Sequence, residues 1–157
     1  DNDPTIYPYA GDTYGDGIDS DCDGMNCQAG FSNGVYYALC DTSGGYSVAQ
    51  NECVDADYDG LASFLDATES AWILQLWLDG QATGIPNNNR AWIGLTKTGS
   101  SWSWSDGSTY AFNNWGGSQP SGDGNCGEIR ITVSNNYYDW NDIPCSHNTQ
   151  YKVCSIR

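Results

Sequence analysis

The sequence predicts a small α+β domain that follows a short, Asp-rich segment. The first observation is a sharp change in composition near residue 26, because residues 1–26 contain seven aspartates, no lysine or arginine and no tryptophan. The second is the order of patterns in residues 27–157, where short strand patterns precede and follow two helical ones. The third is a set of seven cysteines in a chain with one methionine and one histidine, which is typical of a disulfide framework formed in an oxidising compartment.

Charge and hydropathy exclude several classes of function. The 157 residues carry 20 acids against 5 bases, for a net charge of -15, whereas a nucleic-acid-binding protein needs lysine and arginine to replace phosphate counterions. The same charge disfavours docking on an anionic membrane surface. The longest apolar stretch, residues 71–78, is too short for membrane insertion as a spanning helix. Because 39% of the residues are hydrophobic, the chain can form a core and is not an acidic disordered tail.

The domain is expected to begin with a strand and a helix. Residues 34–39 (GVYYAL) form a short strand pattern, and residues 46–53 have helical spacing that places Val48 and Cys53 toward the core. A short apolar run at residues 61–65 is interpreted as a second strand.

A second helix is expected directly after this run. Asp66 and Glu69 have the spacing of a capping box, so the helix begins at Asp66, and Gly80 is expected to end it. Its apolar residues recur with helical period and form the predicted buried stripe, which comprises Trp72, Ile73, Leu76 and Trp77.

The second half of the domain is expected to be mostly strand and loop. Residues 91–95 (AWIGL) are a buried strand pattern, and residues 97–126 are rich in Gly, Ser and Asn with aromatic residues interspersed. A loop of that length in a compact domain is usually functional, and its aromatic residues indicate that it is packed. The remaining strand patterns, at the C-terminal end of the chain, are residues 127–133, 137–142 and 151–156.

Residues 27–157 resemble a C-type lectin-like domain. The resemblance rests on several short motifs that occur in the order of that family. They are a first helix ending in Cys53, L-A-S-F-L with a second helix, Trp92-Ile93-Gly94-Leu95, W-S-W-S-D-G (102–107), Asn114-Trp115, Gln119-Pro120-Ser121, Cys126, Trp140-Asn141-Asp142, Cys145 and Tyr-x-Val-Cys154. The family implies an α+β fold with two helices, small antiparallel sheets, a long loop region and three disulfides.

The resemblance also implies how the cysteines pair. It maps the bridges as Cys53–Cys154, Cys126–Cys145 and Cys27–Cys40, the last being the N-terminal hairpin bridge of the long-form members. Cys22 is then left unpaired, and we expect it to bond a cysteine outside these 157 residues or one in a second subunit. Disulfides of this kind imply a secreted, extracellular or cell-surface protein.

Residues 1–26 are interpreted as a separate segment. D-N-D-P-T-I-Y-P followed by D-G-I-D-S-D-C-D-G is similar to a short metal-binding motif of bacterial surface and secreted proteins. That motif has a cysteine just before the D-G-I-D stretch, where this chain has Gly15. The resemblance implies a prokaryotic secreted protein of several modules.

The long loop is the first candidate cation site. In sugar-binding members of the resembled family, two amide or carboxylate residues flank a cis proline, and a downstream acid and an Asn-Asp pair complete a calcium site. Gln119, Asn141 and Asp142 match that pattern, whereas Ser121 departs from it. Asp123 is the preferred downstream acid, with Asn125 second. About six oxygens but only two formal charges predict weak calcium binding. The alternative is that Trp140-Asn141-Asp142 serves only the fold.

Two further groups of aspartates have calcium-loop spacing. Asp19, Asp21 and Asp23 precede Gly24 in a D-x-D-x-D-G pattern but lack the bidentate acid at position twelve. The coordination shell would be completed from the other side by Asp16, or by Asp1 and Asp3. Seven uncompensated aspartates would repel one another, so cation binding is favoured over a solvated linker. In the other group, Asp55, Asp57 and Asp59 with Asp66, a solvated turn is favoured, because Asp66 is needed as helix cap.

The sequence therefore predicts an extracellular, calcium-dependent recognition module that binds carbohydrate through Gln119-Pro120-Ser121 and Asn141-Asp142. The alternative is a structural or adhesive subunit that contacts a surface protein, or copies of itself in an assembly, with calcium only stabilising loops. An enzyme is not expected, since the single His147 supports no nucleophile–base arrangement. The loop aromatics Trp102, Trp104, Tyr110 and Trp115 either stack on sugars or, as is favoured, pack beneath the loop.

Overall fold

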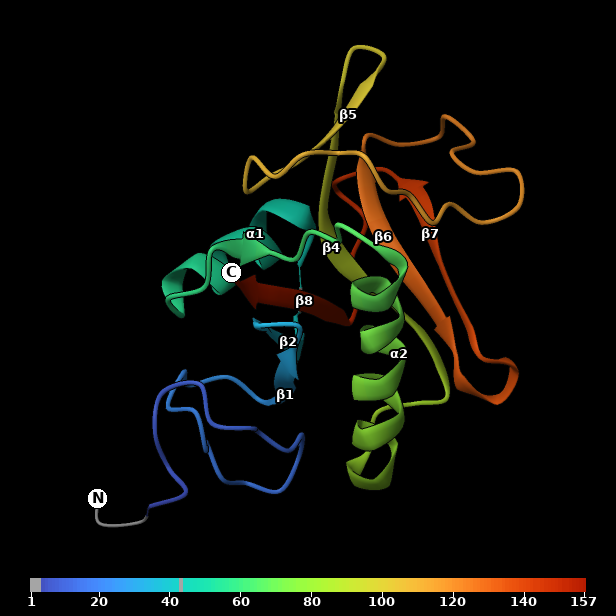
Figure 1. The fold of residues 1–157 in the computed structure, drawn as a ribbon. Coiled ribbons are helices and arrows are strands. Elements are labelled where there is room, and N and C mark those ends of the chain that lie inside the picture. Colours follow the sequence, from blue (N-terminus) through green and yellow to red (C-terminus); the bar gives the residue numbers. More distant parts are fainter. Residues whose placement is uncertain (1–3, 43) are drawn as a thin grey trace.

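A computed structural model describes residues 4–42 and 44–157. One sheet with the strand order β1-β2-β8-β4-β6-β7 runs through the molecule, and two short strands join it at the sides, β3 on β8 and β5 on β4 (Figure 1). The strands are β1 (Cys27–Ser32), β2 (Val35–Asp41), β3 (Gly60–Leu61), β4 (Asn88–Thr98), β5 (Ser101–Trp104), β6 (Cys126–Thr132), β7 (Tyr137–Ile143) and β8 (Tyr151–Ile156). The helices are α1 (Tyr46–Asp55) and α2 (Ala67–Gly80), with single turns η1 (Gln81–Thr83) and η2 (Val133–Asn135).

The α+β prediction is confirmed, and the sheet is mixed. All pairings are antiparallel except that of β4 with β8, which are parallel over Ala91 with Tyr151 and Trp92 with Lys152. This short parallel contact joins the β1-β2-β8 strands to the β4-β6-β7 strands, so the small antiparallel sheets expected from the resemblance form one continuous sheet.

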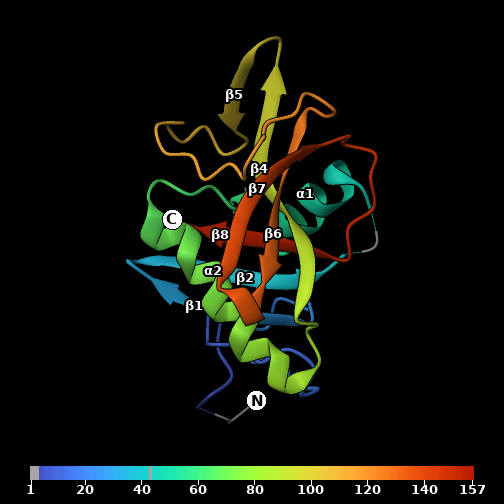
Figure 2. The same cartoon turned by 90° about the vertical axis from the view of Figure 1, so that its right-hand side faces the viewer.

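Helix α2 begins where the sequence predicts. The Asp66 carboxylate accepts hydrogen bonds from the backbone N–H groups of Thr68 (2.8 Å) and Glu69 (3.0 Å), as an N-cap should. The Glu69 carboxylate accepts from the N–H of Leu65 (2.7 Å), one residue before the cap. The helix lies across β1 and β2 (Figure 2). Within its apolar stripe, Ile73, Leu76 and Trp77 are buried, and Trp72 is half-buried.

Three details of the predicted elements are wrong. Val48 is exposed, whereas Cys53 is buried as predicted, because the buried face of α1 passes through Tyr46, Ala49 and Cys53 and not through position 48. Only Gly60–Leu61 of the 61–65 run is strand. The loop expected from residue 97 begins later, because β4 continues to Thr98 and forms a hairpin with β5, whose S-W-S-W alternation was missed.

The core is unusually aromatic next to the long loop. The Trp140 ring is completely buried, and rings of Phe64, Trp104, Phe112 and Trp115 lie with their centroids 5.3–6.0 Å from it. The contacts of Trp140 with Trp104, Phe112 and Trp115 are edge-to-face, and such contacts stabilise a core beyond simple area burial. Trp140 therefore fixes β7 immediately before Asn141 and Asp142.

The N-terminal segment packs on the edge of the sheet. The N–H of Ala29 on β1 donates to the carbonyl of Asp12 (2.9 Å), and Tyr14 Oη donates to the carboxylate of Asp41 on β2 (3.0 Å). The segment and the long loop lie at opposite ends of the molecule (Figure 1). Across residues 4–42 and 44–157, no helix is both long and apolar enough to span a bilayer.

Candidate functional site

The long loop is attached to β7 beside Trp140. The backbone N–H of Gly116 donates to the Trp140 carbonyl (3.0 Å), and the N–H of Gln119 donates back to the Gly116 carbonyl (2.9 Å). The Gln119–Pro120 peptide bond is cis, as expected from the resemblance. The chain thus turns directly above the end of β7, where Asp142 lies.

Asp142 anchors this turn. Its side chain is completely buried, and its two oxygens accept from the backbone N–H groups of Ser121 (2.6 Å) and Gly122 (2.7 Å) and from the Ser121 hydroxyl (3.2 Å). Burial by itself would raise the pKa of Asp142, but the N–H groups of Ser121, Gly122 and Gly124 together lower it. The carboxylate is therefore ionised at neutral pH, because hydrogen bonds to the charged form stabilise it.

Three of the predicted loop ligands contact a fourth, Ser121. Its N–H contacts both the Asp142 carboxylate and Gln119 Oε1 (2.8 Å), while its hydroxyl donates to Asp123 Oδ1 (2.9 Å). The backbone carbonyl of Asn125, the second-choice residue, accepts from the N–H of Lys97 (2.9 Å). The structure thus brings together oxygens of Gln119, Ser121, Asp123 and Asp142.

Asn141 has a different partner. Its Nδ2 donates to Glu128 Oε1 (3.0 Å), a residue that the sequence reasoning did not single out. Burial raises the pKa of the Glu128 carboxyl group, while Arg90 and Asn141 act against that shift. The one sign in the sequence of a functional role for Glu128 was its place as an acid within a strand pattern. That Glu128 lies opposite Asn141 follows from the β6–β7 register.

The loop residues have the donor chemistry of a hard-cation site. All four converging side chains offer oxygen, which calcium prefers, and two of them carry formal charge. The four lone-pair sites of the Asp142 carboxylate face the N–H groups of Ser121, Gly122 and Gly124 and the Ser121 hydroxyl. A cation would have to replace one of these donors, and the contact of the Ser121 hydroxyl (3.2 Å) is longer than those of the Ser121 and Gly122 N–H groups.

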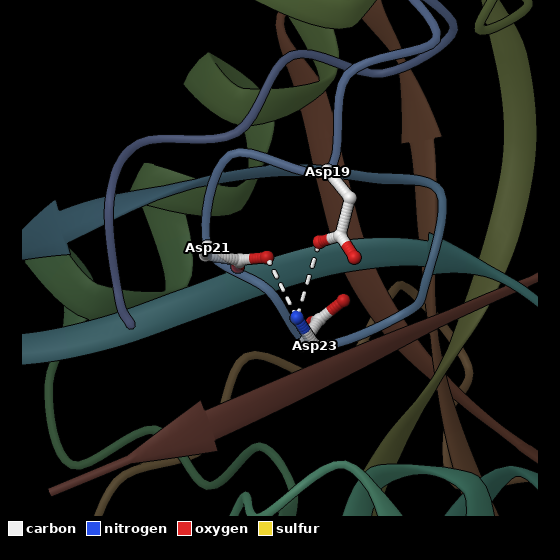
Figure 3. Close-up of side chains that lie close together, drawn as sticks. All are labelled: Asp19, Asp21 and Asp23. Carbon is white, nitrogen blue, oxygen red and sulfur yellow. Dashed lines mark hydrogen bonds between the residues drawn. The ribbon is translucent and has the colours of Figure 1, made fainter. Parts of the chain in front are cut away.

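The three aspartates of the N-terminal segment point toward one another (Figure 3). One carboxylate oxygen from each of Asp19, Asp21 and Asp23 lies within 4.8 Å of the others. The backbone N–H of Asp23 donates to Asp19 (3.1 Å) and Asp21 (3.4 Å). Asp16 lies outside this triad and accepts from the N–H of Ile18 (2.8 Å), while Asp1 and Asp3 lie outside the described residues.

Two tyrosines of the domain hold the triad in place. Tyr36 Oη donates to Asp21 (2.7 Å), and Tyr58 Oη donates to Asp23 (2.7 Å). Burial raises the pKa of Asp21 to about 6, helped by the charges of Asp23 and Asp12 and opposed by the Tyr36 hydroxyl. The segment is therefore joined to the domain through its acidic side chains.

The third acidic group lies beside the same triad. Asp55 and Asp57 line a cavity of about 240 Å³ together with Asp21 and Asp23. Their proposed partners point elsewhere, because the Asp59 carboxylate accepts from the N–H of Arg157 (2.9 Å) and Asp66 caps α2. The spacing of residues 55–66 thus does not produce a loop closed by Asp66.

The remaining candidates are the cysteines, His147 and the aromatic residues of the loop. The three disulfides are Cys27–Cys40, Cys53–Cys154 and Cys126–Cys145, and Cys22 is free and exposed. His147 is exposed. Of the loop aromatics, Trp104 is buried, and the three others pack half-buried against the core, namely Trp102, Tyr110 and Trp115.

The fold and these bridges agree with comparisons to known proteins. Residues 39–156 match the model of the lectin C-type domain, which is well over half of the chain. The chain belongs to the C-type lectin family. This family is non-enzymatic, which confirms the expectation that the chain is not an enzyme. Its disulfide-rich domains are typically extracellular.

Similar proteins include two lectins and a protein of known structure. The chain is 31% identical over 139 residues to the C-type lectin lectoxin-Lio3 of Erythrolamprus poecilogyrus, covering 85% of this chain and 83% of that protein. It is 31% identical over 133 residues to the alpha-N-acetylgalactosamine-specific lectin of Patiria pectinifera, covering 80% and 76%. The structure of human lithostathine has the same fold, with a TM-score of 0.71 and 24% identity over 82% of this chain and 88% of that one. The family match does not support the expected bacterial motif in residues 1–26, because it begins at residue 39.

Proposed function

We propose that this C-type lectin domain is a calcium-dependent carbohydrate-recognition module with its site at the loop end of β7. The main support is that the side chains of Gln119, Asp123 and the buried, ionised Asp142 all contact Ser121. Calcium bound there would be coordinated by side-chain oxygens of these residues and of Asn141, and hydroxyl groups of a sugar would complete its coordination. The relative whose name specifies alpha-N-acetylgalactosamine supports a sugar as ligand.

Calcium binding should be weak. Only Asp123 and Asp142 bring formal charge, so a dissociation constant of about 10⁻⁴–10⁻³ M is expected, the range of extracellular calcium modules. Such a site suits a secreted or cell-surface protein. At ten times that concentration, calcium should raise the unfolding free energy by about 1.4 kcal/mol.

The experiment compares calcium and sugar binding in matched variants. Asp123→Asn and Asp142→Asn each remove one formal charge at the loop, whereas Asp79→Asn makes the same change on the exposed face of α2. Calorimetric titration should show calcium binding weakened at least tenfold in the two loop variants and unchanged in the third. Retention on immobilised N-acetylgalactosamine should require calcium and be lost with either loop variant. Wild-type protein with the same melting curve in calcium and in EDTA contradicts the proposal.

We retain the N-terminal triad as a second calcium site in this proposal. Asp19, Asp21 and Asp23 offer three convergent carboxylate oxygens, and a cation would offset their mutual repulsion. Asp19→Asn separates the two sites, because it should remove one class of calcium binding while leaving sugar retention intact. If Asp19→Asn leaves the calcium titration unchanged, the segment is not a calcium site.

A second candidate function is structural or adhesive. The observation that favours it is that the Asp142 carboxylate accepts hydrogen bonds from the backbone N–H groups of Ser121 and Gly122, which gives this residue a structural role in the loop. In that case the domain would contact a surface protein or further copies of itself, and calcium would only stiffen loops. Calcium-dependent stabilisation without retention on any sugar in a glycan array would favour this function.

A further inference from the structure

Glu128 is a buried acid next to the proposed site. It lies on β6, its side chain is completely buried, and its Cα is paired with that of Asn141 across the β6–β7 ladder. Removing a carboxylate from water costs several kcal/mol unless other groups compensate. Such a residue therefore needs specific partners, and its partners show what it does.

Both partners contact the same oxygen of Glu128. Oε1 accepts from Asn141 Nδ2 (3.0 Å) and from the guanidinium of Arg90 on β4 (3.0 Å). The Arg90 side chain is 45% exposed, so the buried Glu128 forms an ion pair with a guanidinium at the protein surface. Across the part of the chain that the structure describes, Oε2 has no hydrogen-bond partner. The hydrogen-bonding capacity of the Glu128 carboxylate is therefore only partly used within the described residues. Its hydrogen bond to β7 comes from the side-chain amide of Asn141.

The contact fixes which end of that amide is available. A primary amide has a donor nitrogen and an acceptor oxygen, and a carboxylate can only accept. With Nδ2 held by Glu128, the amide oxygen of Asn141 is left for another partner. We propose that Glu128 is a positioning residue, which orients Asn141 so that its oxygen, not its nitrogen, is offered to the calcium ion. This inference rests on the proposed function of the loop.

The first test is Glu128→Gln with a matched control. The glutamine amide can present a donor or an acceptor, so the orientation of Asn141 is no longer fixed. Loss of such a supporting contact weakens metal binding by about 10–100-fold, and we expect that loss in a calorimetric calcium titration. Glu69→Gln makes the same change at another buried carboxyl that pairs with an arginine, Arg157. It should lower the melting temperature and leave the calcium affinity unchanged. An unchanged calcium affinity in Glu128→Gln overturns the inference.

A swap of donor and acceptor supplies the second test. In the double variant Glu128→Gln/Asn141→Asp, the new amide at position 128 donates to the new carboxylate at position 141, and an oxygen at position 141 again faces the loop. Calcium affinity should return to within about tenfold of the wild type in the double variant but not in Asn141→Asp alone, where the carboxylates at positions 128 and 141 repel one another. The added charge by itself predicts equal rescue in both variants. A double variant that binds calcium no better than Glu128→Gln contradicts the positioning role.

A measurement without calcium separates this inference from the proposed function. In calcium-free protein, the side-chain amide protons of Asn141 should exchange slowly and shift in the NMR spectrum of Glu128→Gln but not of Glu69→Gln. If wild-type protein binds no calcium, the proposed function fails, and these resonances still report whether Glu128 holds the amide. Resonances that do not move in Glu128→Gln overturn the inference by themselves.

Discussion

At position 142 a completely buried carboxylate is kept ionised by backbone N–H groups of the loop it faces. Ser121, which contacts this carboxylate, also contacts Gln119 Oε1 and Asp123 Oδ1. Hydrogen bonds within the protein thus hold together the side chains of the site proposed for calcium. A pre-formed arrangement reduces the ordering cost of binding.

Gly124 makes this arrangement possible, and it gives a prediction at the scale of one residue. A Cβ at position 124 would lie 1.8 Å from the backbone carbon of Ile143 and 2.0 Å from its oxygen. Gly124→Ala must therefore push the loop away from β7. We expect a loss of about 1–3 kcal/mol in unfolding free energy and weaker calcium binding, measured by chemical denaturation and calorimetry.

The control for that prediction lies in the same loop. A Cβ at Gly117 would meet nothing within 4 Å, and this glycine has no positive φ. Gly117→Ala should therefore leave both stability and calcium affinity nearly unchanged. Equal behaviour of the two alanine variants would show that the loop is not held against β7 at Gly124.

Among the elements, helix α2 is held at its start by a charge network. Glu69 accepts two hydrogen bonds from the guanidinium of Arg157 (3.0 and 2.7 Å) and one from the N–H of Leu65. Arg157 also donates to the backbone carbonyl of Ser63 (2.8 Å). The network thus connects the end of β8 to the start of α2, two elements that are far apart in the sequence.

This network predicts a pH dependence. Burial alone would raise the pKa of Glu69, but Arg157 and the Leu65 N–H outweigh it, so the pKa is lowered. A lowered folded pKa means that the stabilisation is present above the unfolded value of about 4.3 and is lost as pH falls through the folded value. Glu69→Gln should cost about 1–3 kcal/mol near neutral pH, and the difference from wild type should shrink below about pH 4. A constant difference from pH 7 to pH 3 in denaturant titrations would contradict it.

The elements also show what the sequence could and could not predict. Helix α2 and its Asp66 cap were predictable, because capping and helical period act between residues close in sequence. The β5 strand was missed because its S-W-S-W alternation lies in a Gly- and Ser-rich stretch. Glu128 could not be recognised as a partner of Asn141, since that contact depends on the register of β6 against β7. Patterns between residues close in sequence thus predicted helix α2. The contacts of the candidate site depend instead on how the strands of the sheet pair.

Over the whole molecule, the N-terminal segment and the long loop lie at opposite ends (Figure 1). The loop end carries the site proposed for calcium and carbohydrate. The other end joins the N-terminal segment to the domain through Tyr36 and Tyr58, and there the cavity lined by Asp55 and Asp57 meets the triad. Because the segment is bonded to the domain at several points, a connection made through it would also orient the recognition end.

Cys22 is the residue through which such a connection can be covalent. The other six cysteines form the three disulfides of the domain, and Cys22 is exposed on the segment. An exposed thiol in an oxidising compartment tends to oxidise, so we predict a disulfide to a second subunit or to a cysteine outside these 157 residues. Mass spectrometry of native protein under non-reducing conditions should find the Cys22 peptide cross-linked, and Cys22→Ser should release the partner without changing the melting temperature of the domain. A Cys22 peptide that is alkylated before any reduction would show a free thiol and exclude covalent assembly.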